Sequence, residues 1–257
     1  MVDRKAQILE LLKAQEAVSI AELTRSLEVS RETIRKDLYE LEVDGLLTKV
    51  RGGAVLTASN VETAYDLRSG SYLEAKKAIA RRAAQEVSPG DTVYLDYGTT
   101  TFRIAGELAS IGDITVVTNA LPIVELLSRT PSISVIIPGG ILRGNENSLY
   151  GPITNRSMRY LHFDVGFFGC NGADPAVGFT NPHRSETEVS SLAIERSSRA
   201  VMVIDNSKFG VVAEHVICPQ EQPDLLITDS GASKDFLDAF QAHGVHTVVA
   251  EVEGAKK

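Results

Sequence analysis

Polar residues and glycines follow a series of short apolar runs in this chain, and their types are those that bind an anion and its neighbouring hydroxyl groups. Backbone amides and hydroxyls at the start of a helix suit a phosphate, whereas carboxylates and amides suit hydroxyl groups. The sequence therefore predicts a site for a phosphorylated polyol. Its candidate residues are Asp96, Gly98, Thr99, Thr100, Thr101, Thr118, Asn119, Gly139, Gly140, Arg143, Gly169, Asp205 and Lys208.

Each of these residues also has a purely structural explanation. The threonines can cap a helix, Gly139 and Gly140 can form a turn, Asp205 and Lys208 can form a salt bridge, and Arg143 can be a solvated charge. Their common position after apolar runs favours a ligand site, because ligands of open α/β sheets bind beyond the carboxyl ends of the strands.

A second group of residues has the pattern of a helix that contacts DNA. Ile34, Leu38 and Leu41 recur on one face of a predicted helix, and Arg31 and Arg35 lie together on another. Upstream, residues 19–22 form a capping box that starts a shorter helix. The candidate DNA-binding residues are Ser30, Arg31, Thr33, Arg35, Lys36, Lys49, Arg51 and Gly52.

The elements around this second group predict a winged helix-turn-helix. Residues 28–29 are the expected turn between the two helices, Gly45 ends the second helix, and residues 46–50 and 54–56 form a hairpin whose turn is 51–53. A three-helix bundle with a hairpin is also common in protein-docking modules. Residues 1–56 contain nine Lys or Arg and ten Asp or Glu, so only the placement of the cations favours DNA.

The rest of the chain alternates between strand and helix patterns, which predicts an α/β domain with a mostly parallel sheet. The predicted boundaries are 1–56 for the winged helix, 57–71 for a linker and 72–257 for the α/β domain. A second capping box is expected at 71–74, before a helix over 72–87. The predicted strands are 92–95, 114–117, 134–138, 165–168, 200–204, 225–228 and 247–252, and the predicted helices between them are 102–109, 123–129, 153–161, 186–197 and 234–242.

The composition predicts a cytoplasmic protein of two domains. The net charge is −8, and nearly all of it falls after residue 56, so the larger domain is not expected to bind DNA. Cys170 and Cys218 are expected to be buried thiols, the histidines lack metal-ligand spacing, and neither a membrane span nor a signal peptide is apparent. We therefore expect no metal and no cofactor.

The N-terminal pattern resembles that of the DeoR family of bacterial transcription regulators. The matching segments are 8–12, 19–23, 29–38, 41–46 and 52–54, and Arg51 stands where the family often has His, which retains a donor and adds a fixed charge. The resemblance continues into the α/β domain, at 96–100, 118–119, 139–140, 164–169 and 207–210. It implies a sensor domain similar to sugar-phosphate isomerases.

One departure from the family pattern concerns the helix after Thr180. Relatives often carry a lysine there, whereas this chain has Ser190 and Ser191. If that lysine meets an anion, the pocket has lost a cation, and the ligand either carries less negative charge or is held by Arg184 or Lys208 instead.

The resulting expectation is a DNA-binding repressor of a carbohydrate-metabolism operon, not an enzyme, which is modulated by a phosphorylated sugar or related metabolite and forms a homo-oligomer, a dimer or tetramer. The alternative is a sugar-phosphate isomerase-like enzyme with an added DNA-binding domain. In that case Asp96, Asp164 or Asp205 would act as the base and Lys208 as an electrostatic stabiliser.

Overall fold

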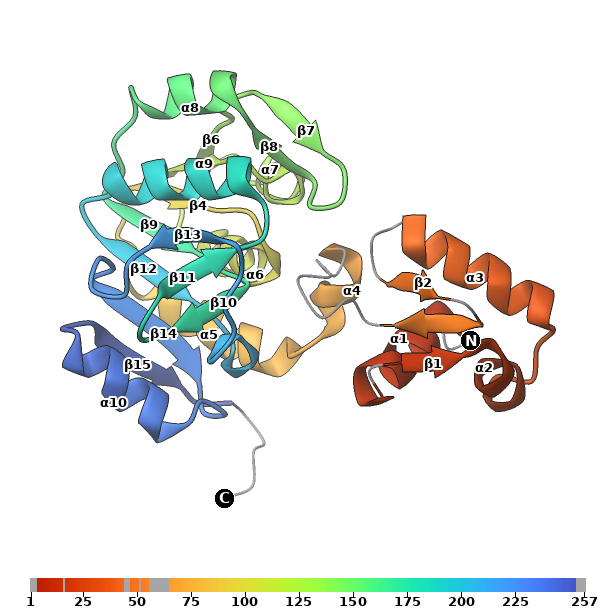
Figure 1. Cartoon of the computed structure of the whole chain (residues 1–257). Helices are drawn as coiled ribbons and strands as arrows, with labels where there is room; N and C mark the ends of the chain where they lie inside the picture. The colour runs from red at the N-terminus through yellow and green to blue at the C-terminus, as the bar shows by residue number, and fades with distance from the viewer. Residues whose placement is uncertain (1–3, 16, 44–46, 51, 56–64, 253–257) are drawn as a thin grey trace. The chain divides into compact units, whose positions relative to one another are not determined.

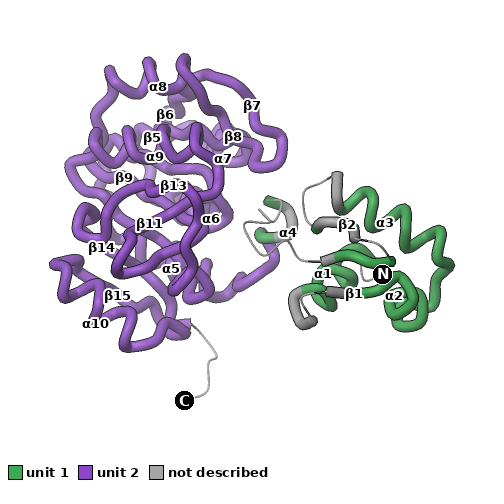
Figure 2. Tube along the Cα trace, in the orientation of Figure 1, with its two compact units in different colours: residues 1–68 green, residues 69–257 purple. Residues whose placement is uncertain are grey.

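The computed structural model describes residues 4–15, 17–43, 47–50, 52–55 and 65–252. The chain divides into two compact units, Met1–Arg68 and Ser69–Lys257, which Figure 2 shows in separate colours. We refer to them as the N-terminal unit and the C-terminal unit.

The N-terminal unit is a winged helix-turn-helix, as the sequence predicts. Its elements are α1 (Arg4–Gln15), β1 (Ala17–Ser19), α2 (Ile20–Ser26), α3 (Arg31–Val43), β2 (Thr48–Val50) and β3 (Gly53–Val55) (Figure 1). The three strands pair in the order β1-β3-β2, and both pairings are antiparallel. Gly45 and Arg51, to which the sequence assigns a helix end and the tip of the wing, lie outside the described residues.

Local sequence signals explain how the helices of this unit start. The capping box is formed, because Ser19 accepts a hydrogen bond from the Glu22 amide and Glu22 accepts one from the Ser19 amide. Ser30 caps α3 by accepting a hydrogen bond from the Thr33 amide. Ile34, Leu38 and Leu41 are buried in the core of the unit, with α1 and β3 contributing to the same cluster.

The C-terminal unit is built on a seven-stranded parallel sheet, as predicted. The strand order is β15-β14-β12-β9-β4-β5-β6. The bounds are β4 (Thr92–Leu95), β5 (Ile114–Thr118), β6 (Ile133–Ile136), β9 (Val165–Phe168), β12 (Ala200–Val203), β14 (Leu225–Asp229) and β15 (His246–Ala250). The order reverses between β4 and β9, so these two strands flank the topological switch point at which such sheets form a crevice.

Helices cover both faces of this sheet. Side chains alternate along the strands, so that Val93 and Leu95 pack in one core and Tyr94 packs in the other. The first core includes residues of α5 (Leu73–Ala84), α6 (Thr99–Leu108) and α7 (Leu121–Leu127). The second includes residues of α8 (Pro152–Met158), α9 (Arg184–Glu195) and α10 (Lys234–Ala242), and Figure 1 shows α9 lying across the sheet.

Two small antiparallel pieces are absent from the sequence-based prediction. One is the hairpin β7 (Ile141–Arg143) and β8 (Ser148–Tyr150). The other is the sheet β10-β11-β13, formed by β10 (Gly172–Asp174), β11 (Gly178–Asn181) and β13 (His215–Cys218). Strands of three or four residues are too short to show a clear period-two pattern.

The predicted capping box at residues 71–74 is wrong. Helix α5 starts at Leu73, its N-cap residue is Tyr72 in the left-handed conformation, and no side chain caps it. Glu74 instead pairs with Lys77, at 2.8 Å between the carboxylate and ammonium groups. Within the stretch that the sequence assigns to a linker, residues 57–64 lie outside the described part and Tyr65–Gly70 form α4. A short 3-10 helix, η1 (Asn206–Lys208), follows β12.

Candidate functional site

The candidate DNA-binding residues lie on α3 and on the wing. Arg31, Arg35 and Lys36 are exposed on α3, whereas Ile34 and Leu38 are buried. The hydroxyls of Ser30 and Thr33 lie 2.8 Å apart at the start of the helix, so their first role is capping. Lys49 is on β2, Gly52 is exposed between β2 and β3, and Arg51 is outside the described residues.

Two acidic residues of α3, Asp37 and Glu40, are held against α1, whereas Glu32 is exposed in the first turn of the helix. Arg4 donates to both carboxylate oxygens of the buried Asp37, at 2.5 and 3.0 Å, and Lys5 lies 2.7 Å from Glu40. Arg31 and Arg35 form no ion pair with any residue that the structure describes. The exposed surface of α3 carries Arg31, Arg35 and Lys36 against the exposed Glu32, so its net charge is positive although that of the unit as a whole is not.

The Lys49 ammonium group lies 5.0 Å from the centre of the exposed Tyr39 ring. This cation–π contact joins the wing strand β2 to α3 and keeps the two cationic elements together.

In the C-terminal unit, Asp96 and Asn119 belong to one buried hydrogen-bond network. The hydroxyl of Tyr94 lies 3.3 Å from Asp96 Oδ1 and 3.2 Å from Asn119 Oδ1, and Asn119 Nδ2 donates to the Leu149 carbonyl on β8. Ser190 on α9 donates to Asp96 Oδ2 at 2.7 Å. The network thus joins the carboxyl ends of β4 and β5 to α9 and to the β7–β8 hairpin.

A buried ion pair extends this network. The guanidinium of Arg143 on β7 contacts the carboxylate of Glu186 on α9, and the hydroxyl of Ser148 on β8 donates to the same carboxylate. Glu186 is completely buried, and the Arg143 side chain is 16% exposed. Because Glu186 and Ser190 are one helical turn apart, α9 presents both to the end of the sheet.

Tyr97 connects the loop after β4 to the small antiparallel sheet. Asn181 on β11 donates through Nδ2 to the Tyr97 hydroxyl at 3.0 Å, and its Oδ1 accepts from the Asn171 amide at 2.8 Å. Gly169, after β9, lies beside the Tyr97 carbonyl. The loops that follow β4 and β9 therefore meet at the switch point of the sheet.

The hydroxyls of the candidate threonines have different surroundings. Thr101 donates to the Gly98 carbonyl at 3.0 Å, and Thr118 accepts from the Ala120 amide, so both hydroxyls have local structural partners. Thr99 and Thr100 are 6% and 8% exposed, in the first turn of α6. Gly98 precedes that turn with φ of 138°, a conformation that favours glycine.

The remaining candidates lie farther along the same edge of the sheet. Asp205 follows β12 and accepts hydrogen bonds from both the amide and the hydroxyl of Ser207, and Lys208 ends η1. In the sheet β9 lies between β4 and β12, so Asp205 follows a strand two positions from the one that Asp96 follows. Asp205 and Lys208 also both influence the pKa of Cys170, which follows β9, and burial raises that pKa to about 12.

Gly139 and Gly140 have a structural role between β6 and β7. The Gly139 carbonyl accepts a hydrogen bond from the Thr154 hydroxyl at 2.7 Å. A Cβ on Gly140 would lie 2.1 Å from that hydroxyl and 2.7 Å from the Tyr150 carbonyl. The close contact, together with φ of 139°, requires glycine at position 140.

Two residues that the sequence singles out lie away from this network. Asp164 precedes β9 and accepts a hydrogen bond from the Thr92 amide at the start of β4. It therefore lies at the amino ends of these strands, whereas Asp96 lies at the carboxyl end of β4, and the two cannot act together. Arg184 is on the outer side of α9, where it pairs with Glu188 at 3.2 Å and is 78% exposed.

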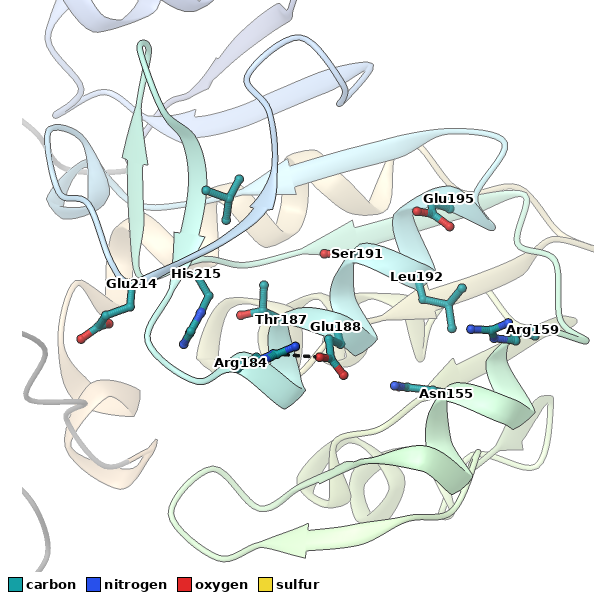
Figure 3. Close-up of a pocket in the computed structure, with 11 residues that line it drawn as sticks. Asn155, Arg159, Arg184, Thr187, Glu188, Ser191, Leu192, Glu195, Glu214 and His215 are labelled. Carbon is teal, nitrogen blue, oxygen red and sulfur yellow. Dashed lines mark hydrogen bonds and ion pairs between the residues drawn. The ribbon is translucent and has the colours of Figure 1, made fainter.

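Arg184 and Glu188 line an open pocket of about 510 Å³ on the outer side of α9 (Figure 3). The pocket lies between α8, α9 and β13, and its lining contains both charge signs, including Arg159, Glu195 and His215. Arg184, which the sequence offers as a substitute for the missing lysine, lines this pocket, but none of the thirteen residues of the candidate phosphate and hydroxyl site does.

The hydrogen-bond network also contains residues that the sequence analysis does not assign to the site, namely Tyr94, Tyr97, Ser148, Asn181, Glu186 and Ser190, of which it mentions Ser190 only as the position of a missing lysine. Tyr94 is indistinguishable from a core residue in a buried strand. Ser190 is separated from Asp96 by 94 positions, so their contact has no local signal. Glu186 was expected only as the start of a helix.

The comparisons with known proteins establish the family. Residues 4–60 match the DeoR-like helix-turn-helix domain, and residues 71–230 match the DeoR C terminal sensor domain. The chain belongs to the DeoR family, and it is therefore a DNA-binding transcriptional regulator with a sensor domain.

Individual relatives match along nearly the whole chain. The HTH-type transcriptional regulator GolR of Listeria innocua is 36% identical over 97% of this chain and 98% of its own length. The glycerol-3-phosphate regulon repressor of Escherichia coli is 34% identical over 93% of this chain and 94% of its own. Among solved structures, ribose 5-phosphate isomerase A of Methanocaldococcus jannaschii is 14% identical, covers 54% of this chain and 55% of its own, and has a TM-score of 0.41.

Two absences within the described residues concern metal ions and membranes. Within the described ranges, no group of three or more His, Cys, Asp or Glu is placed to hold a metal ion. No helix among them is long and apolar enough to span a bilayer.

The buried Asp96 gives a test of the network. The pKa of this carboxyl is raised from 3.8 to about 7, mainly by burial. Hydrogen bonds from Ser190 and the Tyr97 amide lower the pKa, and the charge of Glu186 raises it. A folded-state pKa above the unfolded value means that the native state keeps the proton between about pH 4 and pH 7, so stability falls as pH rises through that window.

Replacing Asp96 by Asn removes this ionisation and keeps the shape. We expect Asp96→Asn to gain stability relative to wild type as pH rises from 4 to 7, by up to roughly 4 kcal/mol, with no further change above that range. Urea unfolding monitored by circular dichroism between pH 4 and pH 8.5 measures the difference, and Asp235→Asn on the exposed start of α10 is the control. A difference for Asp96→Asn that does not depend on pH would contradict the assignment.

Proposed function

We propose that this regulator represses an operon of carbohydrate metabolism. The N-terminal unit binds operator DNA with α3 in the major groove, through Arg31, Arg35 and Lys36, and with Lys49 and the wing against the backbone. The C-terminal unit binds a phosphorylated sugar or related metabolite, without converting it, and the bound metabolite lowers the affinity for the operator. Such a protein acts in the cytoplasm.

The observation that carries this proposal is the exposed cationic face of α3. Arg31 and Arg35 are exposed and form no ion pair within the described part of the chain, whereas Asp37 and Glu40 are occupied by Arg4 and Lys5. Ser30 fixes the start of the helix, and the first turns of a recognition helix are those that reach base edges. Local charge, not the total of the unit, determines attraction to phosphates.

The end of the sheet supports the proposed ligand class. The first turn of the ten-residue helix α6 offers backbone amides beside Thr99 and Thr100. Carboxylate and amide oxygens of Asp96 and Asn119 are acceptors for sugar hydroxyls, and Arg143 supplies a guanidinium for an anion. The name of the Escherichia coli relative, a glycerol-3-phosphate regulon repressor, agrees with a small phosphorylated polyol.

We propose linkage as the means of release. The metabolite binds more tightly to an arrangement of subunits whose winged helices do not match the spacing of the operator half-sites. To move the population from mostly bound to mostly released requires a preference of about 10⁴, or about 5.5 kcal/mol. In a dimer or tetramer each subunit binds one metabolite molecule. The required free-energy difference is then divided among the binding sites, so that each small ligand supplies only a part of it.

The DNA contact is tested by Arg35→Ala. If Arg35 contacts a base, the variant loses about 1 to 3 kcal/mol of operator affinity and discriminates less between the operator and unrelated DNA. The operator is first selected by the wild-type protein from a random DNA pool, and affinities are then measured by fluorescence anisotropy at fixed salt.

The control variant for Arg35→Ala is Arg129→Ala, which removes the same charge from an exposed position on the C-terminal unit, where Arg129 pairs with Glu125. Its operator affinity is expected to equal that of wild type. Unchanged affinity in Arg35→Ala would instead favour a protein-docking role for the N-terminal unit.

The sensing role is tested by the double variant Thr99→Ala with Thr100→Ala. We expect it to bind the operator as wild type does and to lose the response to the metabolite, because the ligand loses the hydroxyls in the first turn of α6 as hydrogen-bond partners. The response is the metabolite concentration that releases half of the DNA, from a panel of sugar phosphates. A double variant that responds like wild type would place the site elsewhere.

A further inference from the structure

The buried ion pair between Arg143 and Glu186 joins two separate elements of the proposed ligand site. Arg143 is the last residue of β7, and Ser148, its partner in the antiparallel register, is the first residue of β8. Both donate to the carboxylate of Glu186, which is on α9 and completely buried. One carboxylate therefore holds both strands of the hairpin against the helix.

The same two donors form a receptor for an anion. A guanidinium presents a planar pair of N–H groups that fits a phosphate as well as a carboxylate, and the adjacent Ser148 hydroxyl adds a third donor. In the structure this receptor is filled by a side chain of the protein itself, Glu186.

Two titratable residues near the receptor, His183 and Asp96, do not add a cation. His183 Nδ1 lies 3.7 Å from the Glu186 carboxylate, but burial lowers the pKa of this histidine, and the charge of Arg143 lowers it further. The carboxyl of Asp96 is linked to the same helix through Ser190. A further negative charge can enter this enclosure only if one of the existing charges is displaced or neutralised.

We propose that Glu186 is an internal competitor for the phosphate of the effector, which replaces the Glu186 carboxylate on Arg143 and Ser148 and thereby frees the β7–β8 hairpin from α9. This inference rests on the proposed sensing function and names how the same site is regulated. The displaced carboxylate stays buried and needs new donors. Hydroxyl groups of the ligand supply them, so the site selects a polyol that carries a phosphate over a phosphate alone.

The test uses inorganic phosphate as the probe and the full chain without DNA. Glu186→Gln keeps the size of the side chain but removes the competing charge, so phosphate affinity measured by calorimetry is expected to rise at least tenfold over wild type. Glu186→Asp, with a shorter reach to Arg143, is expected to show a smaller gain in the same direction, which keeps the test valid if the glutamine variant is poorly folded.

The matched control is Glu188→Gln, which removes a carboxylate from the exposed side of the same helix, where Glu188 pairs with Arg184. It is expected to leave phosphate affinity unchanged. Adding Arg143→Gln to Glu186→Gln is expected to abolish the gain, which separates this receptor from phosphate bound by the cationic face of α3.

The inference is overturned if Glu186→Gln and Glu186→Asp bind phosphate no more tightly than wild type, if none of the proteins binds it, or if the gain persists without Arg143. Because the phosphate-binding experiment contains no DNA, its result does not depend on whether the proposed function is correct. A gain that depends on Arg143, together with no release of DNA by any phosphorylated metabolite, would refute the proposed function and support the receptor.

Discussion

The buried carboxylate of Glu186 is the group on which the arrangement of the proposed ligand site depends. A buried charge is tolerated only when it is paired and hydrogen-bonded, so Glu186 fixes the positions of Arg143 and Ser148 on the hairpin. One turn along α9, Ser190 fixes Asp96 at the end of β4, and Tyr94 connects Asp96 to Asn119 at the end of β5. The carboxyl edge of the sheet, α9 and the hairpin are thus positioned by hydrogen bonds to two carboxylates.

The sequence predicts the framework of this site well for a physical reason. Buried parallel strands are continuous apolar runs, so β4 and β9 are predicted with the bounds that the structure has, and the residues that follow them fall at the switch point. The winged helix is likewise predicted from local signals, because the Ser19–Glu22 capping box and the Ser30 cap are contacts between residues three apart.

The partners of the site could not be predicted because they are distant in the sequence. Arg143 and Glu186 are 43 positions apart, and the hairpin that carries Arg143 has strands of three residues. A local motif can also mislead. Ser71 and Glu74 have the spacing of a capping box, but Tyr72 takes a left-handed conformation and Glu74 pairs with Lys77. A motif of four residues cannot report the conformation that the surrounding structure imposes.

In the proposed linkage the operator and the metabolite bind to different arrangements of one protein, and the reciprocity of their effects tests this most directly. By linkage, the factor by which the metabolite weakens operator binding must equal the factor by which operator DNA weakens metabolite binding. Both factors can be measured by titration, with the metabolite affinity determined in the absence of DNA and at saturating operator. We predict two equal factors well above one. A metabolite that binds with the same affinity in the presence and absence of operator would contradict the account.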